Sequence, residues 1–342
     1  MPVPVEKKTI TMHDVAREAG VSTKTVSRVI NNDGYVSEET RQRVRSTIDH
    51  LGYRPNRAAR NLASNRSGVI GLMIPDVSNP YFSEVVRGVQ NAALKHGYNV
   101  LLFNTESKLD REREAYQFLE EHRVDGAIVN LPFLPREELE VMLSRQKAAV
   151  VVDSYPIGGG VGNVRVDFYD AAVQAVHHMV RTGRGKIGYI SPINAYFTFQ
   201  ERYKGILAGL EAEGIPIRSE YFMELKRTTI EDNYLGAKAL LINHPEINGL
   251  ICFNDMVALG AMKACDEMGI AIPDQMALIG FDDIAFAALS RISLTTMRVP
   301  KFDVGVKSVE MLINRINGVT DPAEYILKAE LVERSTTRIV GL

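Results

Sequence analysis

The 342-residue sequence has no long apolar run and only two cysteines. No apolar stretch reaches the roughly 18 residues that a transmembrane helix needs, so we expect no membrane partner. The first ten residues, MPVPVEKKTI, lack the roughly 7–15-residue apolar core of a secretory signal, which indicates a cytoplasmic location. Cys252 and Cys265 are too few for a disulfide framework and agree with that location.

Motifs that carry catalysis are also missing. There is no G-x-G-x-x-G after an expected strand and no G-x-x-x-x-G-K-[ST]. The stretch PIGGGVGN (156–163) lies between two expected strands and is interpreted as a loop. His177 and His178 have no metal-ligand partner at helical spacing, and no nucleophile motif accompanies Asp282 and Asp283. We therefore expect no catalytic residue, no metal and no cofactor, and a protein that is not an enzyme.

The charge is divided unevenly along the chain. Residues 1–66 hold 12 Lys or Arg against 7 Asp or Glu, a net charge of +5, whereas the rest holds 28 against 35, a net charge of −7. A basic head on a larger acidic body is typical of a polyanion-binding module joined to another unit, but a solvated basic face gives the same pattern. The length predicts two or three folding units.

The head is predicted to contain three short helices. Hydroxyl side chains precede each apolar-periodic stretch and glycines follow the first and third, as expected of helix caps. The expected N-caps are Thr11 (with Asp14 as a near capping box), Ser22 and Ser37, and the expected helix-ending residues are Gly20 and Gly52. A helix, a three-residue turn, a second helix and a supporting third form a helix-turn-helix arrangement.

The second helix is predicted to carry a polar outer face. Its apolar residues Val26, Val29 and Ile30 share one face, which leaves the side chains of Thr23, Lys24, Ser27 and Arg28 on the other. The N-terminal end of such a helix enters the DNA major groove, where Lys24 and Arg28 can donate to guanine O6 and N7.

The stretches TMHDVAREAGVSTKTVSRVIN (11–31) and YVSEETRQRVRSTIDHLGYRPNRAARNLAS (35–64), with the body that follows, resemble the lac repressor/gal repressor (LacI/GalR) family of bacterial transcription regulators. The resemblance covers essentially the whole chain. It implies that Thr23, Lys24 and Arg28 read bases. It also implies that the following residues position the helix on the DNA backbone: Ser22, Thr25, Ser27, Asn31 and Tyr35.

The segment RPNRAARNLAS (54–64) is predicted to be a conditional helix. Pro55 suits a first helical turn, but a helix of about nine residues is shorter than the roughly 12–15 residues that isolated helices need. The family resemblance implies a hinge helix that pairs with a second copy in the minor groove, contacts DNA through Asn56 and Ala59, and wedges Leu62 between base pairs. The alternative is an interdomain linker with incidental alanines.

From Gly68 the sequence alternates fully apolar runs, such as GVIGLMIP and MALIGFDD, with amphipathic helical stretches. This pattern predicts parallel sheets covered on both faces, and about 270 residues are large for one sheet, so we expect two doubly wound lobes. Ligands in such sheets bind at the carboxyl ends of strands. Polar residues stand at those ends: 76–79, Asn130, Asp153, 254–255 and 282–283.

The strand ends predict a site for a hydroxylated ligand. Carboxylates and amides suit vicinal hydroxyls, Arg202 supplies a complementary donor, and Tyr81, Phe82 and Phe197 can cover an apolar ring face. The resemblance implies a fold like that of the periplasmic sugar-binding proteins and assigns these residues to the effector cleft: Asn79, Tyr81, Phe82, Asn130, Asp153, Arg202, Asn254 and Asp282.

The predicted organisation is a DNA-binding domain (1–54), a hinge (55–66) and an effector-binding and dimerisation domain (67–342). Within the last, the N-lobe is expected over about 67–166 and 298–323, and the C-lobe over about 167–297 and 324–342. The expected function is repression of a catabolic operon by a homodimer on a palindromic operator in double-stranded DNA, controlled by a sugar or sugar derivative. The alternatives are a solute-binding protein with no DNA role and a regulator that responds to a purine.

Overall fold

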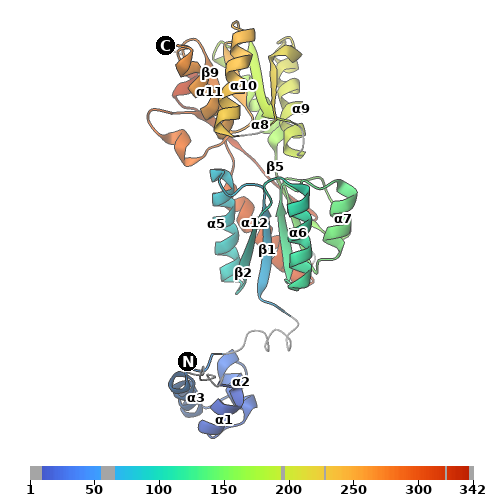
Figure 1. The fold of residues 1–342 in the computed structure, drawn as a ribbon, viewed down its shortest axis with the longest axis vertical. Helices are drawn as coiled ribbons and strands as arrows, with labels where there is room; N and C mark the ends of the chain where they lie inside the picture. Colours follow the sequence, from blue (N-terminus) through green and yellow to red (C-terminus); the bar gives the residue numbers. More distant parts are fainter. Residues whose placement is uncertain (1–9, 55–65, 194–196, 227–228, 320–321, 339–342) are drawn as a thin grey trace, which may run out of the picture. The chain divides into compact units, whose positions relative to one another are not determined.

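The computed structural model describes residues 10–54, 66–193, 197–226, 229–319 and 322–338. The chain forms two compact units, residues 1–67 and 68–342, called here the head and the body (Figure 1). The predicted hinge residues Asn56, Ala59 and Leu62 lie outside the described residues. No helix in the described ranges combines the length and the apolar character that crossing a bilayer requires.

The head contains the three predicted helices, α1 (Met12–Glu18), α2 (Thr23–Asn31) and α3 (Glu38–Leu51). The predicted caps are confirmed. Thr11 and Asp14 form a reciprocal capping box, and the hydroxyls of Ser22 and Ser37 accept the backbone N–H groups three residues further on. Gly20 and Gly52 follow helices α1 and α3 with φ of +64° and +61°, a conformation that glycine adopts without steric cost.

A small apolar core joins the three helices of the head. Its buried members come from the three helices, the C-cap of α1 and the second residue after α3: Val15, Ala16, Ala19, Val26, Val29, Val44 and Tyr53. The small side chains of Ala16 and Ala19 leave room for α2 to cross closely. Because Val26 and Val29 face this core, the polar residues of α2 lie on its outer face, as predicted.

The body contains two six-stranded sheets, each in its own lobe. The N-lobe sheet is parallel, in the order β11-β5-β4-β3-β1-β2, and the C-lobe sheet, β12-β10-β9-β8-β6-β7, is parallel except for β12. The N-lobe strands are β1 (Val69–Ile74), β2 (Asn99–Asn104), β3 (Gly126–Asn130), β4 (Ala149–Val152), β5 (Gly162–Val166) and β11 (Glu324–Leu327). The C-lobe strands are β6 (Ile187–Pro192), β7 (Phe222–Leu225), β8 (Gly249–Cys252), β9 (Ala277–Asp282), β10 (Thr295–Arg298) and β12 (Glu330–Val332).

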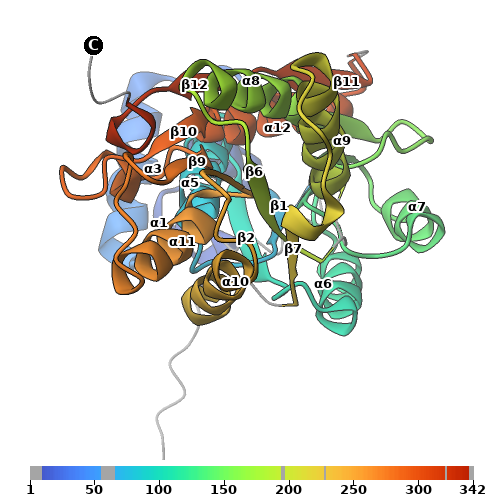
Figure 2. The ribbon, with the colours of Figure 1, turned by 90° about the horizontal axis from the view of Figure 1, so that it is seen from above.

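Helices cover both faces of each sheet (Figures 1 and 2). In the N-lobe, α5 (Pro80–Lys95) packs with α12 (Lys301–Ile316) on one face, and α6 (Leu109–Glu121) and α7 (Arg136–Ser144) lie on the other. In the C-lobe, α8 (Phe168–Arg181) packs with α9 (Phe197–Ala212), and α10 (Ile230–Asn243) packs with α11 (Asp255–Glu267) on the opposite face. Successive residues of a strand alternate between the two cores, since strand side chains alternate in direction.

Two glycines bring α5 and α12 into close contact. A Cβ atom at Gly88 would lie 2.1 Å from the carbonyl oxygen of Phe302, and one at Gly305 would lie 2.3 Å from that of Val85. Such separations leave no space for a side chain. The pair therefore fixes the position of α5, whose first turn carries several residues of the ligand site.

The chain passes between the lobes three times: between β5 and α8, between β10 and α12, and between β11 and β12. The predicted start of the last C-lobe segment at residue 324 is wrong, because β11 pairs with β5 in the N-lobe sheet. Tyr325 and Ile326 are exposed, and an ion pair joins Glu324 to Arg165 at 2.8 Å. A short edge strand of this kind has no buried apolar run for sequence analysis to detect.

Candidate ligand cavity and nucleic-acid interface

The outer face of α2 is basic and rich in hydrogen-bonding groups. Lys24 and Arg28 are exposed, and Thr23, Thr25 and Ser27 are half-exposed. Within the described part of the head, neither Lys24 nor Arg28 pairs with an acidic side chain. Two cations without internal partners beside several hydroxyls form a surface that suits the edge and backbone of a nucleic acid.

Some of the predicted DNA-contacting residues also shape the helix. The Ser22 hydroxyl accepts the Thr25 backbone N–H at 3.1 Å and lies 2.9 Å from the Thr25 hydroxyl oxygen. The Asn31 side chain donates to the Ser27 hydroxyl at 3.3 Å. Tyr35, in the turn after α2, is 91% exposed. Its side chain is therefore accessible to another molecule.

Gly34 leaves space for the Arg28 side chain. Its φ is +67°, and a Cβ atom there would lie 3.3 Å from Arg28 Nε. The guanidinium therefore runs along the turn that follows α2. A side chain at residue 34 would strain the backbone and push against Arg28 at the same time.

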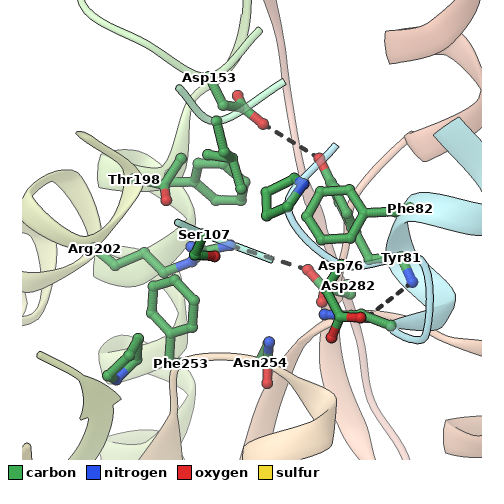
Figure 3. A pocket seen from close by; sticks show the side chains of 15 residues that line it. Asp76, Tyr81, Phe82, Ser107, Asp153, Thr198, Arg202, Phe253, Asn254 and Asp282 are labelled. Atoms are coloured by element: carbon green, nitrogen blue, oxygen red, sulfur yellow. Dashed lines mark hydrogen bonds and ion pairs between the residues drawn. The ribbon is translucent and has the colours of Figure 1, made fainter. Parts of the chain in front are cut away.

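The body has a cavity that both lobes line, with about 680 Å³ of empty space that is partly open to solvent (Figure 3). Seven of the eight predicted effector residues line it: Asn79, Tyr81, Phe82, Asp153, Arg202, Asn254 and Asp282. Asn130 does not. It is buried at the end of β3, and no described residue partners its side-chain oxygen or nitrogen.

Several lining residues were not among the predicted site residues: Pro75, Asp76, Ser107, Leu131, Phe168, Pro192, Thr198 and Phe253. Phe253 directly precedes Asn254, and Pro75 and Asp76 directly follow β1, so the rule that ligands bind at strand ends was sufficient to find them. Phe168 lies where the chain passes from β5 into the other lobe, and only the tertiary structure brings it to the cavity.

Arg202 is the buried cation of the cavity, with 4% of its surface exposed. Its guanidinium carbon lies 3.7 Å from the ring centre of Phe168 and 4.2 Å from that of Phe253. The nearest carboxylate oxygen belongs to Asp282 at 4.0 Å, beyond hydrogen-bond distance, and Arg202 Nε has no partner among the described residues. Burial lowers the pKa of Arg202. Aromatic ring faces thus hold the guanidinium, and its Nε–H remains available to donate a hydrogen bond to a ligand.

Asp153 lies at the end of β4, on the N-lobe side of the cavity. One carboxylate oxygen accepts the Val166 backbone N–H at 2.8 Å, and the other accepts the Tyr81 hydroxyl at 3.2 Å. Burial raises the pKa of Asp153 to about 6, and these donors and Arg202 act against that rise. Burial also raises the pKa of Tyr81 well above its usual value, so the phenol stays a donor.

Asp282 stands at the end of β9, on the C-lobe side. Burial raises its pKa to about 7, and the nearby cations Arg202 and Lys301 act in the opposite direction. The Lys301 ammonium, at the start of α12, donates to the backbone carbonyl of Asp282 and, at 3.0 Å, to that of Asp283. An N-lobe helix therefore holds the C-lobe strand end that carries the carboxylate.

Four cavity-lining residues have left-handed backbone conformations. Their φ values are +54° for Ser107, +49° for Leu131, +52° for Asp153 and +107° for Asp282. Non-glycine residues adopt this region at an energetic cost, and such residues cluster at binding sites. The strand ends are thus bent to aim side chains into the cavity.

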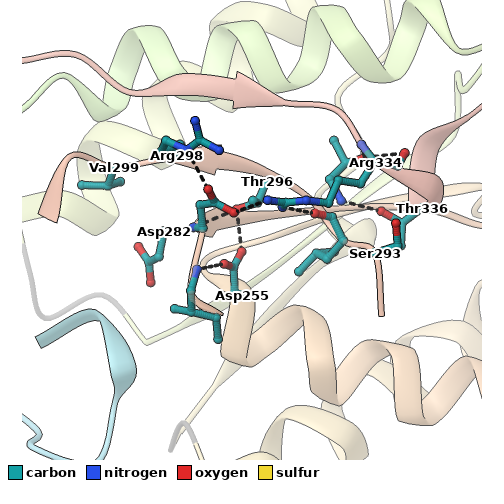
Figure 4. Close-up of polar contacts among 12 residues, drawn as sticks. Asp255, Asp282, Ser293, Thr296, Arg298, Val299, Arg334 and Thr336 are labelled. Carbon is teal, nitrogen blue, oxygen red and sulfur yellow. Dashed lines mark hydrogen bonds and ion pairs between the residues drawn. The ribbon is translucent and has the colours of Figure 1, made fainter. Parts of the chain in front are cut away.

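The neighbouring carboxylates have structural partners (Figure 4). Asp255 accepts the Thr296 hydroxyl at 2.6 Å and the Ile284 backbone N–H at 2.8 Å, and burial raises its pKa. Asp283 accepts Arg298 and Arg334, each at 2.7 Å. Burial alone would raise the pKa of Asp283, but the two arginines lower it. Of these acidic residues, Asp282 is the one that lines the cavity.

The two asparagines of the cavity cap helices. Asn79 Oδ1 accepts the Tyr81 N–H at 3.0 Å at the start of α5, and Asn254 Oδ1 accepts the Val257 N–H at 2.9 Å at the start of α11. Their amide nitrogens remain as donors. In the described residues no group of three or more His, Cys, Asp or Glu is placed to hold a metal ion.

The cavity therefore offers acceptors, donors and flat apolar walls to a small ligand. Asp153 and Asp282 are acceptors on opposite lobes, Arg202 and the two asparagines are donors, and aromatic rings supply flat apolar walls. A ligand that contacts both carboxylates bridges the lobes.

The fold and cavity define a protein with a helix-turn-helix domain followed by a body of the periplasmic-binding type. Residues 11–56 match the family described as bacterial regulatory proteins, lacI family, and residues 67–334 match the periplasmic binding proteins and sugar binding domain of the LacI family. The "Ribose operon repressor" of Halalkalibacterium halodurans is 36% identical over 96% of this chain and 97% of its own. The chain therefore belongs to the LacI family, whose members are transcriptional regulators.

Solved structures agree with this assignment. A lac repressor dimer bound to operator and the anti-inducer ONPF is similar with a TM-score of 0.87 and 26% identity, over 96% of this chain and 99% of the other. A LacI family transcriptional regulator from Enterococcus faecium with bound ribose is similar with a TM-score of 0.73 and 25% identity, over 80% of this chain and the full length of the other.

Proposed function

We propose that this protein is a repressor of a catabolic operon that binds a palindromic operator as a homodimer and responds to a sugar or sugar derivative in the interlobe cavity. The observation that carries the proposal is that Arg202, held by aromatic rings, lines the same buried cavity as the carboxylates of Asp153 and Asp282. Vicinal hydroxyls can donate to a carboxylate and accept from a guanidinium at once. The name of the Halalkalibacterium relative and the ribose-bound neighbour also favour a sugar.

For the head, the proposal assigns base reading to Thr23, Lys24 and Arg28. The half-exposed hydroxyls of α2, with Asn31 and Tyr35, then contact the DNA backbone. One head covers half a site, so two copies related by a twofold axis match a palindrome. The exposure and unpaired charge of Lys24 and Arg28 support this division.

Control of DNA binding is proposed to follow from thermodynamic linkage between the effector cavity and the DNA-binding surface. Residues 55–66, with Asn56, Ala59 and Leu62, are proposed to fold in the minor groove only when the interlobe angle allows two copies to meet. Shifting such an equilibrium from 1:99 to 99:1 needs about 5.5 kcal/mol of differential effector binding. Two or three buried charge-assisted hydrogen bonds, each about 1.5–3 kcal/mol, are sufficient.

The hinge part of the proposal has its own test. Hydrogen exchange of amides 56–64 is measured in the free protein, with operator DNA, and with a scrambled duplex. Protection with the operator alone is expected, because a helix of about nine residues is marginal by itself. Strong protection in the free protein would contradict folding coupled to DNA binding.

The effector is tested by a thermal-shift screen of pentoses, hexoses, disaccharides, phosphosugars and purine bases, followed by calorimetry. We expect a neutral saccharide to bind wild type and not the Arg202→Ala variant, and to change operator affinity in a gel shift. The variant should bind the operator normally without ligand. Binding of a purine base alone would replace the sugar assignment, because flat aromatic walls also suit a purine ring.

A solute-binding protein with no DNA role is the remaining alternative. A selection from random double-stranded DNA, read by sequencing, separates the two functions. A repressor should enrich a twofold-symmetric site, and the Arg28→Ala variant should lose preference at one base pair of each half. Recovery of no symmetric site with or without saccharide would favour the solute-binding alternative.

A further inference from the structure

A second cavity, called here the aromatic chamber, adjoins the ligand cavity. It has about 680 Å³ of empty space, which includes space open to solvent. It is lined by Pro132, Phe133, Leu134, Pro135, Arg136, Leu139, Asp153, Ser154, Tyr155, Ile157 and Phe197. Phe197, which the sequence analysis placed against a ligand ring, lines this chamber and not the first cavity. No step of the proposed function uses the chamber.

The two cavities share a boundary. Asp153 lines both. Leu131 and Thr198 face the first cavity, whereas their chain neighbours Pro132 and Phe197 face the chamber. The same three strand-end and helix-start segments therefore lie between the two spaces, and Asp153 borders both a ligand in the first cavity and a group in the chamber.

Both lobes contribute to the chamber, the C-lobe through Phe197. Tyr155, from the loop after β4, contacts Phe197 of α9 edge to face with ring centres 4.8 Å apart, and its hydroxyl donates to Gln200 at 2.6 Å. The buried carboxylate of Glu112 accepts the Phe133 backbone N–H at 2.9 Å, which holds the loop after β3 in place.

The chemistry of the lining favours a ring over an anion. Phenyl, prolyl and aliphatic groups make up most of the wall. Arg136 is already engaged with Glu140 at 3.0 Å and with the Pro156 carbonyl at 3.2 Å, and Asp153 would repel a negative group. Aromatic and prolyl faces interspersed with polar groups suit a ring that has both an apolar face and polar edges, as a sugar ring does.

We propose that the aromatic chamber binds the second ring of a two-part effector, so that the effector is a glycoside or disaccharide and not a free monosaccharide. The inference rests on the proposed function, in which the first sugar ring occupies the cavity of Arg202. A second ring in the chamber touches Tyr155 of one lobe and Phe197 of the other, so it contributes directly to the interlobe angle.

The experiment is calorimetry on the full-length protein with glucose, galactose and ribose, each as the free sugar, the methyl β-glycoside and the phenyl β-glycoside, together with cellobiose and lactose. At least one phenyl glycoside or disaccharide should bind about tenfold more tightly than the methyl glycoside of the same sugar. Tighter binding of a phenyl glycoside would indicate that the chamber accepts an apolar aglycone. Tighter binding of a disaccharide would indicate that it accepts a second sugar ring.

Variants locate the effect. Tyr155→Ala should remove the preference for the second ring and leave methyl glycoside affinity within about twofold of wild type. Tyr155→Phe, which keeps the ring but loses the bond to Gln200, should retain the preference. The matched control is Phe118→Ala, since Phe118 is 38% exposed on the same lobe and Tyr155 is 37% exposed. The control should change nothing.

Two results would overturn the inference alone: equal affinities for methyl, phenyl and disaccharide ligands, or an equal loss for all of them in Tyr155→Ala. Loss of free-sugar and methyl glycoside binding in Arg202→Ala tests the proposed function separately. Failure of every saccharide to bind wild type would overturn both.

Discussion

The variant Arg202→Met is expected to lose effector binding but to keep a free energy of unfolding close to that of wild type. Arg202 is buried, and its Nε has no partner among the described residues. Its Nη2 lies 4.0 Å from Asp282 Oδ1. Removing one member of a buried ion pair costs about 3–5 kcal/mol when the other charge stays buried without compensation. Asp282 can avoid that cost, because burial already raises its pKa to about 7 and the carboxylate can take up a proton when the guanidinium is lost. Methionine keeps the length of the side chain between Phe168 and Phe253.

The expected magnitudes follow. Loss of the cation–π contacts costs about 0.5–2 kcal/mol, which the removed desolvation penalty of the guanidinium offsets. At pH 6, where the Asp282 carboxyl is mostly protonated, the free energy of unfolding should therefore stay within about 1 kcal/mol of wild type or rise. Effector binding should lose two charge-assisted hydrogen bonds, about 3–6 kcal/mol, and the dissociation constant should rise at least about 100-fold. Urea denaturation of the ligand-free protein and calorimetry with the saccharide found by screening measure the two quantities.

Arg334→Met is the matched control. Arg334 is half-buried outside the cavity and donates to Asp283 at 2.7 Å and to the Leu294 carbonyl at 2.8 Å. Its loss should lower the free energy of unfolding by about 1–3 kcal/mol and leave effector affinity nearly unchanged. If Arg202→Met were destabilised by more than about 2 kcal/mol, the arginine would be a structural residue. If Arg202→Met bound the effector normally, the assignment of Arg202 to the effector site would be wrong.

Four further predictions use other parts of the molecule. Arg28→Ala should cost about 1–3 kcal/mol of specific DNA binding and relax preference at one base pair, as gel shifts on base-substituted operators can measure; a uniform loss would mean a phosphate contact. Thr11→Ala should lower the stability of the head by about 1 kcal/mol, read from hydrogen exchange in α1, and unchanged exchange would refute the capping argument. Effector affinity should fall about tenfold per pH unit below about 7. The reason is that burial raises the pKa of the Asp282 carboxyl to about 7, and this group must lose a proton to accept hydroxyls. Tighter binding in calorimetry at pH 6 than at pH 8 would contradict this. The same raised pKa predicts that the ligand-free body loses stability in urea denaturation as pH rises towards 7, since the folded state keeps a proton that the unfolded state releases.

The head was predictable because its signals are local. A hydroxyl at Ser22 and a glycine at residue 20 act on backbone groups within three residues, and the spacing of Val26 and Val29 determines which face is buried. Once the buried face of α2 was predicted, the residues of its outer face were determined as well. No long-range contact was needed to place Lys24 and Arg28 on the surface.

The cavity was predictable only in part, because strand ends tell where a ligand site lies but not which way each side chain turns. Asp153 and Asn130 both end parallel strands, yet the left-handed residue after Asn130 is Leu131, and it is Leu131 that reaches the cavity. Phe168 reaches the cavity through the passage from β5 to α8, which no local pattern marks. The aromatic chamber likewise depends on loops of the N-lobe and on the first residue of α9 in the C-lobe.

The pair Asp282 and Asp283 joins the ligand site to the interlobe passages. Both residues have positive φ, so the chain bends sharply and sends the two carboxylates in different directions. Asp282 lines the cavity, and Asp283 is fixed by Arg298, the last residue of β10 before the chain passes to the N-lobe. Lys301 donates to both backbone carbonyls from the first residue of α12. A ligand that moves Asp282 must therefore also move α12 or break these bonds, which gives the change of interlobe angle a direct structural route.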